Sequence, residues 1–251
     1  MRKIDCRHSG FLGAFREVAV LVAIAMLSTV AGRLHAQTQS SLTVSDSTAT
    51  RVMACTACHG ERGQGSEDDY FPRLAGKPAG YLYNQLVSFR DGQRKYPPMN
   101  YLLAYLPDTY LHEMAGYFAS QQAPFPVLPR LSVGPQVLAL GKKLVLKGDA
   151  ARHIPACVAC HGASLTGMSP DIPGLLGLHS KYISAQLGAS RYGTRIASKS
   201  NCMQPLTKLL SETDITAVSA YLSSLPAPAN PAPAPAGSLK LALSCEGAEA
   251  R

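Results

Sequence analysis

The chain has 251 residues and a formal net charge of +8, and 46% of its residues are hydrophobic. This length allows one large or two small domains, and the hydrophobic content argues against global disorder. The charge does not indicate a nucleic-acid-binding protein, because no basic run is interleaved with aromatic residues.

Residues 1–36 have the features of an export signal. Four basic residues lie within the first 16, a largely apolar run of 14 residues follows from Val18 to Ala31, and Ala36 ends an acceptable cleavage site. The alternative is a retained anchor with membrane association, but 14 residues fall short of the roughly 20 that span a bilayer. Cleavage would remove five basic and two acidic residues and lower the net charge to about +5.

Two copies of the pentad Cys-x-x-Cys-His, at 55–59 and 157–161, are the strongest signal in the sequence. Each is the attachment signature for a c-type haem, in which both thiols add to vinyl groups and the imidazole binds the iron. The pentads predict two haem c groups and electron transfer. The attachment candidates are Cys55, Cys58, Cys157 and Cys160, and the proximal ligands are His59 and His161.

Two Cys-x-x-Cys pairs also occur in zinc modules. The export signal, the histidine directly after each pair and the repeat described next argue against that alternative.

The second half of the chain repeats the first. Pro72-Arg73-Leu74-Ala75-Gly76 matches Pro173-Gly174-Leu175-Leu176-Gly177 at a shift of 101 residues. At the same shift Tyr81, Gln85 and Arg94 correspond to Tyr182, Gln186 and Arg195, whereas Tyr117 aligns with Tyr221 at a shift of 104. Small changes of shift between matching blocks indicate loop insertions in a duplicated domain.

Hydrophobic periodicity predicts helices in both halves and no convincing run of strands. Residues at helical spacing mark one helix around 82–89, one around 137–144 that ends at Gly148, and a last helix in each half, at 111–118 and 215–225. Ser211 and Asp214 predict a capping box at the last of these. Its counterpart Pro107 suits a helix start.

Composition then divides the chain into five segments. They are a signal peptide (1–36), a first domain (37–123), a proline-rich linker (124–132), a second domain (133–225), and a Pro/Ala-rich spacer and tail (226–251).

A six-coordinate haem needs a second axial ligand, and Met or His is usual in electron-transfer sites. Met99, in the Pro97-Pro98-Met99 loop, and Met203 lie 40 and 42 residues beyond their histidines, at nearly the same place in the repeat. The weaker alternatives are Met53 and Met114 in the first half, Met168 and the Cys202 thiolate in the second, and His112, His153 and His179.

Other side chains would support the haems. The carbonyls of Pro72 and Pro173, 13 and 12 residues beyond their histidines, can accept from the proximal imidazoles, although both prolines could simply form turns. Four arginines could either neutralise the haem propionates or simply lie exposed at helix ends, and the sequence favours neither interpretation. They are Arg90, Arg94, Arg191 and Arg195. Cys202 and Cys245 remain as a disulfide candidate or as two free thiols.

The sequence resembles the di-haem class I cytochromes c, most of all the cytochrome c4 group. Between about residues 45 and 225 it carries Cys-x-x-Cys-His-Gly, Pro-x-Leu-Ala-Gly, Tyr-Leu-x-x-Gln-Leu, Phe-Arg-x-Gly-x-Arg and Leu-Ser-x-x-Asp-Ile. The resemblance implies an all-α fold of two tandem class I cytochrome c domains, each wrapped around one covalent haem, in the bacterial periplasm. It also implies Met99 and Met203 as distal ligands. Ser190, where the first half has Phe89, and Cys202 depart from the pattern.

We therefore expect an electron-transfer protein rather than an enzyme. It would carry electrons one at a time between respiratory partners, from a quinol-oxidising complex or a dehydrogenase to a terminal oxidase. The alternative is the cytochrome subunit of a specific periplasmic dehydrogenase complex. A di-haem peroxidase would need an open distal site, which two well-placed methionines argue against.

Overall fold

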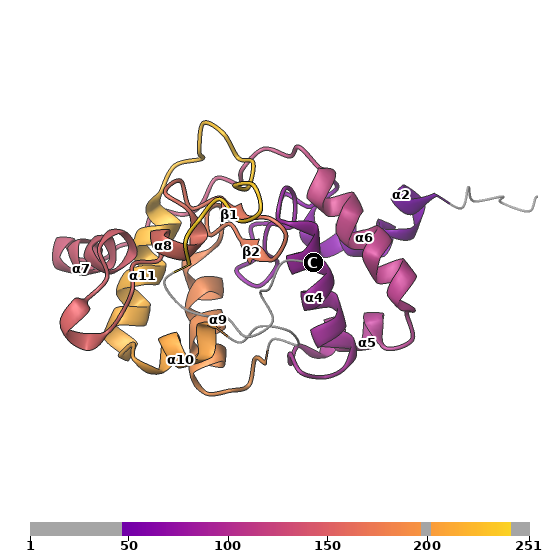
Figure 1. The fold of residues 1–251 in the computed structure, drawn as a ribbon. Helices are drawn as coiled ribbons and strands as arrows, with labels where there is room; N and C mark the ends of the chain where they lie inside the picture. Colours follow the sequence, from indigo (N-terminus) through magenta and orange to yellow (C-terminus); the bar gives the residue numbers. More distant parts are fainter. Residues whose placement is uncertain (1–46, 197–201, 242–251) are drawn as a thin grey trace, which may run out of the picture. The chain divides into compact units, whose positions relative to one another are not determined.

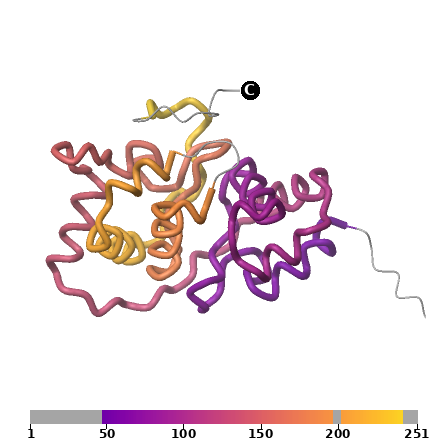
Figure 2. The backbone as a smooth tube through the Cα atoms, turned by 90° about the horizontal axis from the view of Figure 1, so that it is seen from below, coloured from indigo at the N-terminus to yellow at the C-terminus, as the bar shows by residue number. Residues whose placement is uncertain are grey.

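The computed structural model describes residues 47–196 and 202–241, so the expected signal peptide lies outside the described residues. Two helical halves follow one another along the chain and belong to one compact unit (Figures 1 and 2). None of the helices in the described ranges is long and apolar enough to cross a membrane.

The first half is made of helices joined by glycine-rich turns. They are α2 (Thr48–Arg51), α3 (Met53–His59), α4 (Ala79–Arg90), α5 (Pro97–Leu103) and α6 (Asp108–Ser120). The predicted helical stripes form its core, in which Leu82 and Phe89 of α4 pack against Leu111, Met114 and Phe118 of α6.

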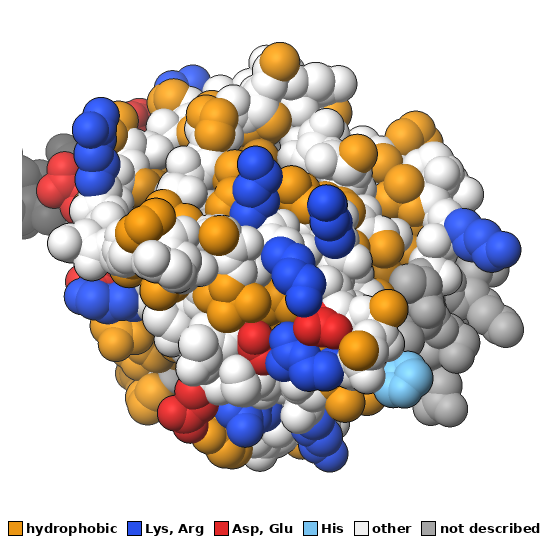
Figure 3. All heavy atoms as spheres, turned by 90° about the vertical axis from the view of Figure 1, so that its left-hand side faces the viewer, with side chains coloured by type: hydrophobic (Ala, Val, Ile, Leu, Met, Phe, Trp, Pro, Cys, Tyr) orange, Lys and Arg blue, Asp and Glu red, His pale blue; other side chains and the backbone are white. Residues whose placement is uncertain are grey.

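The second half repeats this plan and adds a longer opening helix. Its elements are α7 (Pro135–Leu146), the 3-10 helix η1 (Ala150–Arg152), α8 (Val158–His161), β1 (Gly167–Met168), β2 (Ile172–Pro173), α9 (Ser180–Arg191), α10 (Met203–Lys208) and α11 (Glu212–Ser224). The side of the molecule where α7 lies in Figure 1 carries several Lys and Arg side chains among hydrophobic ones (Figure 3).

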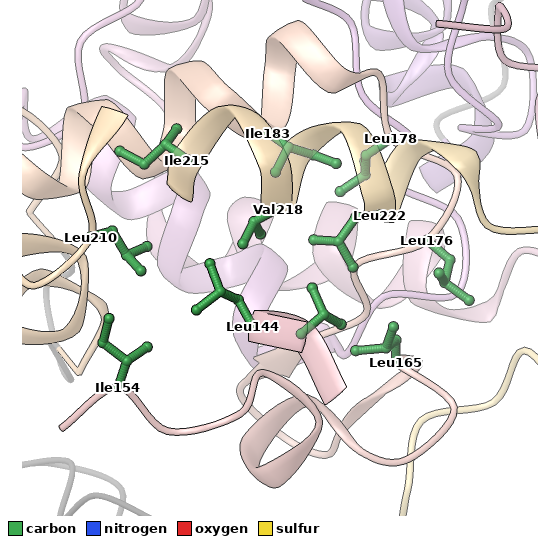
Figure 4. Close-up of a cluster of buried hydrophobic side chains, with 11 residues drawn as sticks. Leu144, Ile154, Leu165, Leu176, Leu178, Ile183, Leu210, Ile215, Val218 and Leu222 are labelled. Atoms are coloured by element: carbon green, nitrogen blue, oxygen red, sulfur yellow. The ribbon is translucent and has the colours of Figure 1, made fainter. Parts of the chain in front are cut away.

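Helices α7 and α11 approach closely in the core of the second half. A Cβ at Gly141 of α7 would overlap the carbonyl oxygen of Ala217 on α11, so this contact requires glycine. Leu144 of α7 then reaches Val218 and Leu222 of α11 within a cluster of buried aliphatic side chains (Figure 4).

Helix ends agree with the local sequence rules. The predicted capping box at Ser211 and Asp214 is confirmed, because each side chain bonds the backbone N–H of the other residue. Pro107 is the residue before α6, as expected of a helix start. Residues 121–134, which include the proline-rich linker, form neither helix nor strand.

One local prediction needs correction. Met99 lies in the first turn of α5 rather than in a loop, because Pro97 and Pro98 favour a helix start and Tyr96 donates its N–H to the Asn100 side chain at 2.9 Å. A short antiparallel pair also joins β1 to β2. The Pro/Ala-rich spacer is largely exposed and forms no helix, as its composition suggests, and it contacts the second half at Ala234, whose N–H donates to Gly167 O at 2.9 Å.

Candidate haem-binding sites

The first pentad forms most of α3 and places its histidine at the last helical position. His59 is buried, with 7% of its surface exposed, and its Nδ1 lies 2.9 Å from the carbonyl oxygen of Pro72. In the second half α8 ends at His161, which is 8% exposed and whose Nδ1 lies 2.7 Å from Pro173 O.

These two contacts determine which nitrogen of each imidazole carries the hydrogen. A carbonyl can only accept, so Nδ1 carries the hydrogen and Nε2 keeps the lone pair that binds a metal. Burial lowers the pKa of His59 and of His161, and it outweighs the opposing effect of the proline carbonyls. Both rings are therefore held in the neutral form and in one tautomer.

The four pentad cysteines are free thiols rather than disulfide partners of one another. Burial raises the pKa of Cys55, and it raises that of Cys157 to about 11. Within the described ranges, no three His, Cys, Asp or Glu side chains gather as they would around a metal ion.

A cavity in the second half brings its predicted site residues together. Cys157, Cys160 and His161 line it, and Met203, the first residue of α10, lines it as well. Aliphatic side chains form much of the rest of the wall, namely Ile183, Leu187, Leu206, Val218 and Leu222, and polar side chains such as Gln186 and Arg195 also line it. Two thiols, a neutral imidazole, a thioether and an apolar wall are the donor set and surroundings that fit a covalently attached haem.

In the first half two of the corresponding residues, Cys55 and Met99, share one core. Both are partly buried and pack against the cluster of α4 and α6, with Val52 at its base. Met114 is 3% exposed and lies within this core, as expected of a structural residue.

Three of the other ligand alternatives are engaged elsewhere. His179 lies 2.9 Å from Ser66 O through Nε2 and 3.3 Å from Asp69 through Nδ1, and the His112 ring stacks on Tyr83. Cys202 lines the second cavity but is disulfide-bonded, so it offers no thiolate to the iron. The two other cysteines that belong to neither pentad, Cys6 and Cys245, lie outside the described residues.

Two arginines at equivalent positions of the repeat make reciprocal contacts between the halves. Arg94 donates to Tyr182 Oη at 2.9 Å and to Gln186 Oε1 at 2.6 Å. In return Arg195 donates to Tyr81 Oη at 3.2 Å and to Gln85 Oε1 at 2.9 Å. Arg90 instead pairs with Asp91 and Asp108.

Among the contributors to the second cavity that sequence reasoning missed are Lys77 from the first half and Leu241 from the tail. Nothing in the local pattern of either residue marks it. Tyr81 and Gln85 also line the cavity, and their recurrence in the repeat was a usable signal.

Comparison with known proteins agrees with this geometry. The family model for cytochrome c matches the chain twice, at residues 48–120 and 138–226. The chain is a di-haem cytochrome c of the c4 type. Each of its two tandem cytochrome c domains carries one covalent haem c.

Individual relatives cover most of the cytochrome. It is 37% identical to cytochrome c4 of Pseudomonas aeruginosa over 180 residues, which are 70% of the chain and 85% of that protein. It is also 37% identical to the thiosulfate dehydrogenase electron acceptor of Stutzerimonas stutzeri, with 69% and 80% covered. The crystal structure of reduced cytochrome c4 from Pseudomonas stutzeri matches with a TM-score of 0.61 at 30% identity, covering 71% of the chain and 96% of that structure.

Proposed function

We propose that this cytochrome works in the bacterial periplasm, where it takes electrons from a dehydrogenase or a quinol-oxidising complex and passes them to a terminal oxidase. Its family transfers electrons between redox proteins. The observation that carries the proposal is the second cavity, which two thiols, a neutral imidazole and a thioether line together with several aliphatic side chains.

We assign the site residues as follows. Cys55 and Cys58 attach the first haem, and Cys157 and Cys160 attach the second. The axial ligands are His59 with Met99 and His161 with Met203. When bound, each haem supplies an iron that gains or loses one electron.

The protein side chains fix and tune these sites. Pro72 O and Pro173 O accept from Nδ1 and so hold the imidazoles in the tautomer whose Nε2 would be free to bind the haem iron. A neutral thioether favours ferrous iron and raises the potential relative to a second imidazole. The buried, apolar surroundings act in the same direction, because they disfavour the more highly charged ferric state.

The contact between halves suits electron exchange within the chain. Tyr81 and Gln85 of the first half line the second cavity, so the first domain forms part of the second site. The crossed arginine contacts hold the two domains in one arrangement, which fixes the distance over which an electron would move.

A redox titration of the exported protein tests the proposal. We expect two covalent haems by mass and two one-electron steps in the visible spectrum. A single haem, or haem released by denaturation, would contradict the assigned attachment. Peroxide turnover by the same preparation would contradict electron transfer as the function.

A dedicated role with one dehydrogenase is the second candidate. It is favoured by the similarity to the thiosulfate dehydrogenase electron acceptor of Stutzerimonas stutzeri. Stopped-flow mixing of the oxidised cytochrome with thiosulfate and thiosulfate dehydrogenase separates the candidates. Rapid haem reduction that saturates at low cytochrome concentration supports the dedicated role, and slow unsaturated reduction supports a general carrier.

A further inference from the structure

A lysine of the first domain is built into the second haem site. Lys77 follows the turn at Gly76, is 8% exposed, and donates from Nζ to the carbonyl oxygen of Gly174 at 2.7 Å. Gly174 directly follows Pro173, whose carbonyl orients His161. Lys77 also lines the cavity that contains His161.

The position is costly for a cation. None of the ion pairs within residues 47–196 and 202–241 includes Lys77, and burial lowers its pKa to about 7, with a further contribution from the nearby Arg73 charge. An exposed lysine would avoid this penalty, since an ammonium group is strongly hydrated in water. A buried ammonium at this position is therefore a specific feature of the second site.

The repeat shows that only the second haem site has a lysine at this position. At the shift of 101 residues that relates Gly76 to Gly177, Lys77 corresponds to Leu178, which is buried and apolar. This position therefore supplies a charge to the second haem site and none to the first.

We propose that Lys77 is a positioning residue of the first domain that raises the reduction potential of the second haem. The inference rests on the proposed attachment of that haem at Cys157 and Cys160. Ferric haem carries one more positive charge than ferrous haem, so a nearby ammonium in a low-dielectric interior favours the reduced state. The bond to Gly174 O keeps the ammonium beside the segment that orients His161.

Redox titration of holoprotein variants at pH 6 tests the assignment, since Lys77 is protonated there even with its lowered pKa. Lys77→Met removes the charge and the donor, whereas Lys77→Gln removes the charge and keeps a donor. Lys142→Met, at an exposed position of α7, is the matched control. Haem resonances followed by NMR during the titration assign each potential to its domain.

We expect both Lys77 variants to lower the second potential and leave the first unchanged, with no change in Lys142→Met. The equilibrium constant for electron exchange between the haems should shift by about tenfold, which is about 59 mV for one electron. If Lys77→Met does not fold, Lys77→Gln decides alone. An unchanged second potential in Lys77→Gln overturns the inference. Failure of the unmodified protein to titrate in two steps would instead overturn the proposed function.

Discussion

Arg94 and Arg195 occupy equivalent positions in the two halves and pair with each other across the contact between them. Their backbones form an antiparallel bridge, and each guanidinium donates to the tyrosine and the glutamine of the opposite half. The duplicated sequence thus forms a reciprocal contact, in which each copy supplies both the donor and the acceptors.

Replacing Arg94 tests how strongly this contact holds the halves. Arg94 is 8% exposed and also lies over the Phe89 ring, with its guanidinium carbon 4.4 Å from the ring centre. Arg94→Ala should lower the free energy of unfolding by about 2–3 kcal/mol, because it leaves buried acceptors without a charged donor. Guanidinium denaturation of the holoprotein measures this, with exposed Arg130→Ala as control. Equal stability of the two variants would contradict a structural role for the contact.

The two arginines should also be coupled. Both donate to Gln85, so the loss from Arg94→Ala and Arg195→Ala together should differ from the sum of the single losses by about 0.5–3 kcal/mol. A double-mutant cycle by denaturation measures the difference. Strict additivity would show that each arginine acts alone.

Met203 is the assigned distal ligand of the second haem, and its removal should change the potential without changing attachment. Met203→Leu replaces a thioether by a hydrocarbon of similar volume, so the iron loses its soft neutral ligand and ferrous haem is less favoured. The second potential should fall while both haems stay bound on a denaturing gel. Met114→Leu, in the core of the first half, is the control. Two unchanged potentials in Met203→Leu would rule out this ligand.

Much of this arrangement could be predicted from the sequence, because the chemistry of the pentads and the helical stripes are local. The spacing of Leu111, Met114 and Phe118 indicates a helix face whatever surrounds it. Lys77 could not be predicted, because its partner Gly174 is 97 residues away and depends on how the domains meet. Met99 lies in a helix where the sequence predicts a loop, because proline is favoured in a first helical turn and here two prolines open α5.

The second domain should lose stability in acid through Asp214. Burial would raise the pKa of Asp214, but hydrogen bonds from Arg152 and Ser211 outweigh it and hold the pKa below its usual value. A lowered pKa in the folded state contributes stability above the unfolded pKa of about 4, and this is lost as pH falls through the folded pKa. Asp214→Asn should therefore cost about 1–2 kcal/mol at pH 7 and progressively less toward pH 3.

Denaturation of Asp214→Asn and the unmodified protein at both pH values gives the comparison. Glu61→Gln, at an exposed position, is the control and should follow the unmodified protein. A destabilisation by Asp214→Asn of the same size at pH 3 would show that the carboxylate charge is not involved.

The C-terminal tail should shield the second haem from water. Ala234 exchanges backbone hydrogen bonds with Gly167 and Ser169, and Leu241 lines the second cavity. Leu241→Ser should admit water, which stabilises the more highly charged ferric state, so the second potential should fall while the first stays unchanged. Ser238→Ala, at an exposed position of the same segment, is the control. This point variant is more informative than deleting residues 228–251, because deletion also removes Cys245, a candidate partner of Cys202. If Leu241→Ser leaves the second potential where it was, the tail contributes contacts to the fold but no shielding of the haem.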